Sequence, residues 1–211
     1  MIQESVTIGS FLTYLAFTMY LYFNQLPWPR DVLTLSVMGI IKSVSILSLT
    51  PRHYDNRRLS NSLFDFPFLY YALGDMVMMF DIYYSIPWFC IGHVLAIHQI
   101  RKEEDVRRPL WLDMFLLLSI LPIITVIHVY ALYLLYTMLL VKMSYEGYKN
   151  ELIFPIFLIV SDIFIITETA TTMLTWALYY IFIIELSIHI DRSINSRMEM
   201  ENHQMGKLPN K

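Results

Sequence analysis

The sequence predicts an all-α protein, a polytopic bundle of eight transmembrane helices. Two observations of composition support this fold class: 56% of the 211 residues are hydrophobic and only 16% are charged. Soluble domains contain about 45–50% apolar and about 25% charged residues. The third observation is that the charges cluster in short groups between long apolar stretches, as expected when each span needs about 20 apolar residues.

Seven apolar segments are visible along the chain, at roughly 7–23, 32–50, 63–80, 86–100, 110–143, 151–168 and 171–190. The fifth would be about 50 Å long as one helix, compared with about 30 Å for the hydrocarbon core of a bilayer. Pro122 and His128 lie near its middle. Two short helices meeting at a turn are therefore the alternative to one long helix that leaves the membrane.

The distribution of basic residues favours two helices in the fifth segment. Eight spans place every lysine and arginine except Arg30 and Lys42 on one side of the membrane. Seven spans would divide the last basic residues between the two sides, contrary to the positive-inside rule. The sequence thus predicts an eight-span domain over 1–190, both termini in the cytosol, and a disordered cytosolic tail over 191–211.

Several functional classes receive no support from the sequence. A net charge of −3 gives no indication of nucleic-acid binding. Cys90 is the single cysteine, so a disulfide framework is excluded, and the N-terminus lacks the basic region of a cleaved signal peptide. The spacing of His93, His98 and His128 does not suggest a metal site, and we expect neither a metal nor another cofactor.

Four ionisable residues lie far from either end of their predicted spans: Lys42, Asp75, His93 and Asp162. Counted from the non-cytosolic ends, they occupy a layer about 10 Å thick. A charged side chain in the centre of a lone membrane helix costs at least about 2.5–3.5 kcal/mol. Four such groups at similar depth suggest one polar pocket. The alternative is structural, in which Lys42 pairs with one of the aspartates and ties helices together.

A short internal similarity surrounds the two aspartates. ALGDMVMMF at 72–80 and IVSDIFIIT at 159–167 each place a small residue before an aspartate that apolar residues follow. Both spans run in the same direction under the eight-span topology. Two four-helix halves that each contribute one acid to a common cavity would explain this similarity.

The same residues give the chain a resemblance to the lysoplasmalogenase (YhhN-like) family of multi-pass membrane proteins. In order along the chain, the residues that carry the resemblance are Lys42, Gly74–Asp75, His93, Ser161–Asp162 and Tyr179–Tyr180. The ordered set and the eight-span layout extend over roughly 7–190. A single Gly-Asp or Ser-Asp pair would mean nothing alone.

The resemblance implies a function in ether-lipid metabolism. Family members hydrolyse the vinyl-ether bond of 1-alkenyl lysophospholipids to a fatty aldehyde and a glycerophospho-head group. The implied partners are the lysophospholipid substrate and the bilayer of the endoplasmic reticulum or another endomembrane. No cofactor is implied.

Each site residue has an expected role in that reaction, which resembles glycoside cleavage by paired carboxyl groups. Asp75 and Asp162 are expected to serve as acid and base, with neither role assigned to either residue. His93 would relay a proton or hold water, or else be a packed, hydrogen-bonded residue. Lys42 would favour the ionised form of its partner. Gly74 and Ser161 belong to the pocket, and Tyr179 or Tyr180 would orient the ether or bind phosphate, or simply pack.

Two other functions remain open at this stage. Intramembrane acids and histidines also mark proton-coupled transporters. Transporters often have helices broken by Gly or Pro at corresponding positions of two halves. This chain has only six glycines and no paired pattern of prolines, which disfavours a transporter. A diverged, non-catalytic membrane protein is the third possibility.

Overall fold

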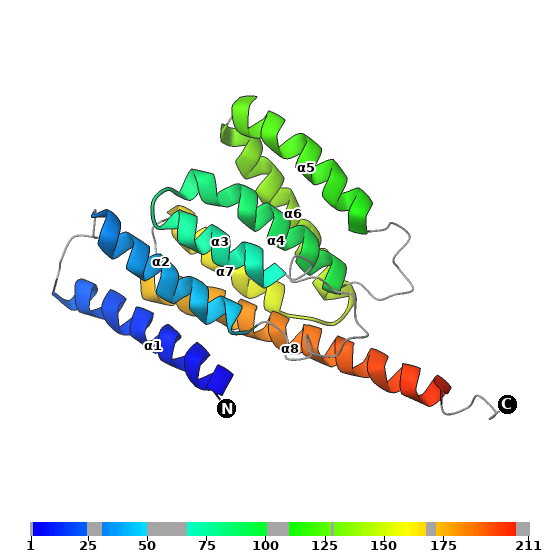
Figure 1. Ribbon diagram of the computed structural model, residues 1–211. Helices are drawn as coiled ribbons and strands as arrows, with labels where there is room; N and C mark the ends of the chain where they lie inside the picture. The colour runs from blue at the N-terminus through cyan, green and yellow to red at the C-terminus, as the bar shows by residue number, and fades with distance from the viewer. Residues whose placement is uncertain are drawn as a thin grey trace.

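The computed structural model describes residues 2–24, 31–49, 67–100, 110–127, 129–167 and 172–205. These residues form eight helices and no strand (Figure 1). The helices are α1 (Ile2–Phe23), α2 (Val32–Leu47), α3 (Pro67–Met78), α4 (Ile82–Ile100), α5 (Leu110–Ile127), α6 (Val129–Lys149), α7 (Phe154–Thr167) and α8 (Thr172–Met205). The prediction of an all-α fold is confirmed.

The long apolar segment at 110–143 forms two helices. Helix α5 ends at Ile127 and α6 begins at Val129, and the two pack against each other (Figure 1). Pro122 lies inside α5 and is not the break point. His128, the other residue expected at the break, lies outside the described residues.

The lengths of the helices give limited support to a membrane bundle. Within the described ranges, one helical stretch is long and apolar enough to cross a membrane, Leu174–Arg192 in α8. Four further apolar stretches are shorter: Ile8–Leu21, Val32–Leu47, Asp113–Ile123 and Phe154–Phe164. The predicted start of the third span, at 63–66, lies outside the described residues. Length and composition thus identify one candidate span.

The C-terminal tail differs from the prediction of disorder after residue 190. Helix α8 continues without interruption as far as Met205, one residue before Gly206 (Figure 1). The segment 193–205 contains no glycine or proline, and seven of its thirteen residues are Met, Glu, Gln or Arg, which favour helix without any apolar periodicity. Glycine commonly follows the end of a helix. Local propensity therefore extends this helix beyond the bundle.

The core lies where α2, α3, α4, α7 and α8 pack together. Its fully buried side chains include Ile46 of α2, Tyr71 of α3 and Phe182 of α8. A second apolar cluster joins α4 to α5 and α6 and contains the buried free thiol of Cys90. Cys90 is thus a small core residue.

Three serine hydroxyls connect neighbouring helices by donating to backbone carbonyl oxygens. They are Ser43 to Ala72 (2.8 Å), Ser161 to Thr175 (2.9 Å) and Ser187 to Leu49 (2.7 Å). The first joins α2 to α3, the second joins α7 to α8, and the third joins α8 to the chain just after α2. The same helices carry Lys42, Asp75, Asp162 and Tyr179.

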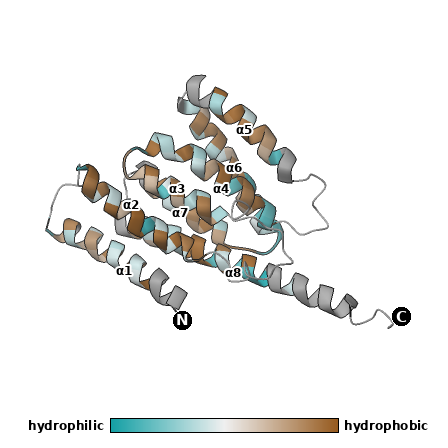
Figure 2. Cartoon of the chain, viewed as in Figure 1, coloured by the Kyte–Doolittle hydropathy of each residue, from teal (hydrophilic) through white to brown (hydrophobic). Residues whose placement is uncertain are grey.

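Many large apolar side chains point outward from the bundle. Exposed examples include Leu33 on α2, Phe115 on α5, Met138 on α6 and Ile156 on α7. Figure 2 shows hydrophobic residues along much of the outer helices. Monomeric soluble proteins rarely expose such extensive apolar surface.

At the start of α2, Asp31 accepts a hydrogen bond from the Thr34 backbone N–H at 2.7 Å, which lowers the pKa of that carboxyl.

Candidate active site

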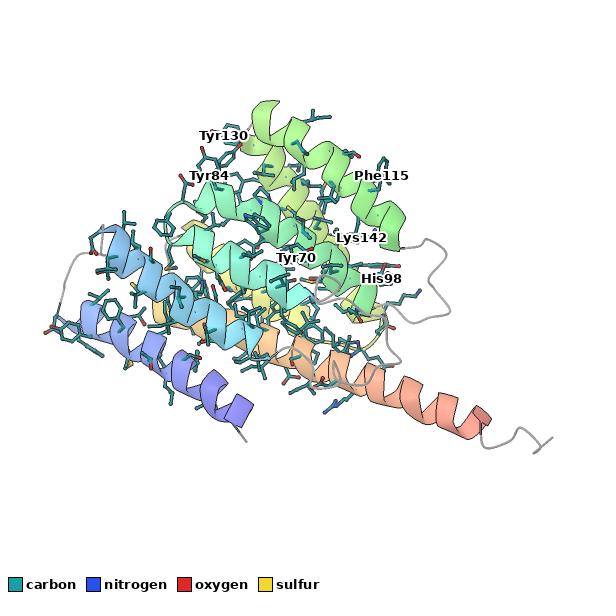
Figure 3. The ribbon with its side chains drawn as sticks, in the orientation of Figure 1. Tyr70, Tyr84, His98, Phe115, Tyr130 and Lys142 are labelled. Atoms are coloured by element: carbon teal, nitrogen blue, oxygen red, sulfur yellow. The ribbon has the colours of Figure 1, made fainter. Side chains whose placement is uncertain are left out.

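A cavity of about 200 Å³ lies between α3, α4, α6, α7 and α8. Five residues predicted for the site line it: Asp75, His93, Ser161, Asp162 and Tyr179. Helices α4 and α6 run in the same direction beside it, since Tyr84 and Tyr130 mark one end of the pair and His98 and Lys142 the other (Figure 3). Most of the remaining wall is apolar.

Lys42 lies behind the cavity wall and neutralises Asp75. The Lys42 Nζ forms an ion pair with Asp75 Oδ1, and the Tyr179 hydroxyl donates to Asp75 Oδ2 at 3.0 Å. Both charged side chains are fully buried. The Lys42 Nζ also lies 3.0 Å from the centroid of the Trp176 ring, in a cation–π contact. The sequence left the partner of Lys42 open, and in the structure it is Asp75.

Asp162 has a different environment from Asp75. The Tyr136 hydroxyl donates to Asp162 Oδ2 at 2.8 Å, which joins α6 to α7. Asp162 is partly exposed, and within the described ranges it has no cationic partner. One carboxyl group of the cavity is therefore held by an ammonium group, whereas the other is held only by a neutral phenol.

Of the two ring nitrogens of His93, one is hydrogen-bonded to the protein and the other is not. Its Nδ1 is 2.8 Å from the Tyr71 hydroxyl. Its Nε2 has no hydrogen-bond partner in the part of the chain that the structure describes, although the side chain is fully buried. The ring lies between Tyr71 and Tyr136, with centroids 5.5 and 5.0 Å away. A histidine held in this way can position water or pass a proton.

Besides Lys42, three predicted site residues serve the site indirectly or lie outside it. Tyr180 does not line the cavity, and its ring packs edge-on against Phe11. Gly74 is also outside the lining and packs against the ring of Phe89. Ser161 lines the cavity, but its hydroxyl is used in the bond to α8.

Sequence reasoning missed Tyr136 and Trp176. Both line the cavity, where Tyr136 holds Asp162 and Trp176 covers Lys42. Aromatic residues are frequent throughout this chain, so neither of the two stands out in the sequence. One available signal was the spacing of Tyr133, Tyr136 and Thr137, which places three hydroxyls on one side of α6.

The close packing of Gly74 gives a test of the α3–α4 contact. A Cβ at Gly74 would lie 2.9 Å from Cε1 of Phe89, a buried side chain of the cavity wall. We expect Gly74→Ala to destabilise the protein by about 1–3 kcal/mol through overpacking. Thermal unfolding in detergent measures this change. Gly9→Ala is the control, because nothing lies within 4 Å of the added methyl, and an unchanged Gly74→Ala protein would contradict the packing described here.

Comparison with known proteins adds no further assignment. No protein-family model, curated protein or solved structure matches this chain. Among the described residues there is also no group of three His, Cys, Asp or Glu side chains that could hold a metal ion.

Proposed function

We propose that the protein is a membrane hydrolase that cleaves the vinyl-ether bond of 1-alkenyl lysophospholipids. The observation that supports this most directly is the placement of Asp75, Asp162 and His93 on the wall of one mostly apolar cavity. Such a cavity suits a substrate that is a hydrocarbon chain with a single reactive bond. The ordered residues that resemble the lysoplasmalogenase family are the second support.

The proposal includes a multi-pass arrangement in an endomembrane, with both termini in the cytosol. The outward apolar side chains of the bundle would contact lipid in that arrangement. A buried Lys–Asp pair and a buried histidine would then lie inside the bundle, away from lipid, as is usual for ionisable residues in membrane proteins. The parallel course of α4 and α6 is compatible with eight spans.

The reaction divides into three steps. An acid protonates the outer alkene carbon of the vinyl ether, which places the positive charge on an oxocarbenium ion at the carbon bonded to oxygen. Water then adds to that carbon and loses a proton to a base. The resulting hemiacetal breaks its carbon–oxygen bond, the glycerol oxygen leaves with a proton, and the products are an aldehyde and an alcohol.

The environments of the two aspartates favour a division of these tasks. Asp75, paired with Lys42, is suited to remain a carboxylate and to stabilise the cation electrostatically. Asp162, held by the neutral Tyr136 hydroxyl, is suited to carry the proton that is given to the alkene. His93, with its free Nε2, is suited to hold the attacking water.

The decisive experiment is an assay of aldehyde release by the purified protein in detergent. We expect release from a 1-alkenyl lysophospholipid and none from the 1-alkyl analogue, which has no double bond to protonate. A 1-acyl lysophospholipid serves as a second control for ester hydrolysis. Absence of aldehyde across head groups and pH values would refute the proposal.

A proton-coupled transporter is the second candidate function. The observation in its favour is the fully buried Lys42–Asp75 pair beside a cavity, because such pairs can bind and release a proton during transport. Reconstitution into sealed vesicles separates the two functions. Solute-dependent proton flux without aldehyde release would favour the transporter.

A further inference from the structure

The cavity has a mouth, and the exposed members of its lining show where the mouth is. Most lining residues on α3, α4 and α8 are buried, including Asp75, Phe89 and Tyr179. On α6 and α7, by contrast, Val141 and Ile163 are 60% and 50% exposed. The exposed lining residues therefore lie mainly along the seam between α6 and α7, with one more, Ile82, 44% exposed at the start of α4.

The rim of this mouth follows the geometry of the two helices. Tyr133, Thr137 and Val141 are four residues apart on α6, and Ile159 and Ile163 are four apart on α7. Residues at this spacing lie on one side of a helix. From Tyr133 to Val141 the helix advances by eight steps of about 1.5 Å, so the rim is about 12 Å long.

Polar groups lie on the cavity side of the mouth. The Tyr136–Asp162 hydrogen bond crosses from α6 to α7 there. His93 and Trp176 also line the cavity, and His93 Nε2 and Trp176 Nε1 have no hydrogen-bond partner in the described ranges, although both side chains are more than nine-tenths buried. Buried polar atoms without a protein partner are rare and expensive. A ligand with a neutral oxygen at the end of its chain would satisfy them.

We propose that the seam between α6 and α7 admits a single hydrocarbon chain of a lipid from the side. The chain would lie along the apolar rim, its ether oxygen would face the polar groups inside the cavity, and the glycerophosphate bonded to that oxygen would turn back out of the mouth. No lysine or arginine lines the described cavity wall, so a phosphate group would have no cation there and would remain outside. This inference rests on the proposed function for the identity of the lipid, but it concerns binding and not cleavage.

Two substitutions narrow the mouth, and the same helices provide matched controls. Val141→Trp and Ile163→Trp place a large ring on the rim. Met138→Trp on α6 and Ile156→Trp on α7 are the controls, because these residues are 62% and 52% exposed and do not line the cavity. Each pair thus compares the same substitution on the same helix at nearly equal exposure.

Binding is measured with a lipid that the enzyme cannot cleave. The probe is a 1-alkyl lysophosphatidylcholine with a diazirine in its chain, photolysed with the full-length protein in vesicles of phosphatidylcholine. We expect labelling that unlabelled 1-alkyl lysophosphatidylcholine suppresses, with adducts in 133–141 and 159–163. Both rim variants should lose about tenfold in suppressible labelling, equivalent to about 1.4 kcal/mol, with both controls unchanged.

The adduct map of the unmodified protein keeps the test decisive even if a tryptophan variant fails to fold. Adducts spread evenly over the outer helices, or equal losses in rim and control variants, would overturn the lateral entrance. Suppressible labelling at the rim of a protein that releases no aldehyde would support the entrance and refute the hydrolase. Aldehyde release with labelling elsewhere would refute the entrance alone.

Discussion

Asp162→Asn and Asp75→Asn are each expected to reduce aldehyde release by about 10²–10⁴-fold, the usual contribution of a general acid or of an electrostatic stabiliser. Asparagine keeps the shape of the side chain, but it cannot give the proton that Asp162 would carry and it lacks the negative charge with which Asp75 would stabilise the cation. Asp162→Asn should change stability little, because Tyr136 can still donate to the amide oxygen. Initial rates on a 1-alkenyl lysophospholipid, measured at matched yield and thermal stability, check the prediction.

The control variant for this prediction is Asp113→Asn. Asp113 lies on α5, outside the described wall of the cavity, so its substitution should leave the rate unchanged. Full activity of Asp162→Asn in an otherwise active enzyme would remove this residue from the mechanism. Equal losses in Asp113→Asn would show that the assay reports a general effect of lost carboxylates.

Lys42→Met is expected to destabilise the protein by about 3–5 kcal/mol, because it leaves the fully buried Asp75 without its cation. The double variant Lys42→Met with Asp75→Leu should regain most of that stability, since apolar replacement of a buried ion pair is often neutral. The double variant should nevertheless be inactive. Thermal unfolding and aldehyde release are measured on both variants and on the unmodified protein.

The double variant distinguishes a purely structural pair from a functional one. If Lys42 and Asp75 serve only to tie α2 to α3, restored stability should restore whatever activity the protein has. Recovery of stability without activity would assign the pair to the site. A stable, active Lys42→Met protein would contradict the ion pair itself.

The number of helices and the shared cavity were predictable because both depend on signals that accumulate along the chain. Long apolar runs between charge clusters indicated the helices, and the charge distribution divided 110–143 into α5 and α6. Counting residues from span ends placed Asp75, His93 and Asp162 at one depth, and all three line one cavity. Depth is readable from sequence since each residue advances a helix by a fixed rise.

The partners of these residues were not predictable, because depth contains no information on rotation about the helix axis. Two aspartates lay at a suitable depth for Lys42. Because α2 packs against α3, its partner in the structure is Asp75. Tyr136 was missed for the same reason, as nothing in the sequence shows that its hydroxyl faces α7. The helical end of α8 was missed because it has no apolar periodicity. The intrinsic helix propensity of its residues forms the helix there.

The three serine hydroxyls that join the helices also bear on how this site could change over evolution. Each donates to a backbone carbonyl, at Ala72, Thr175 and Leu49, and every residue type supplies that acceptor. Only the donor position is therefore restricted in residue type, and the acceptor position is free to drift. The helices that carry the charged groups can therefore keep their alignment while the residue types at the acceptor positions change.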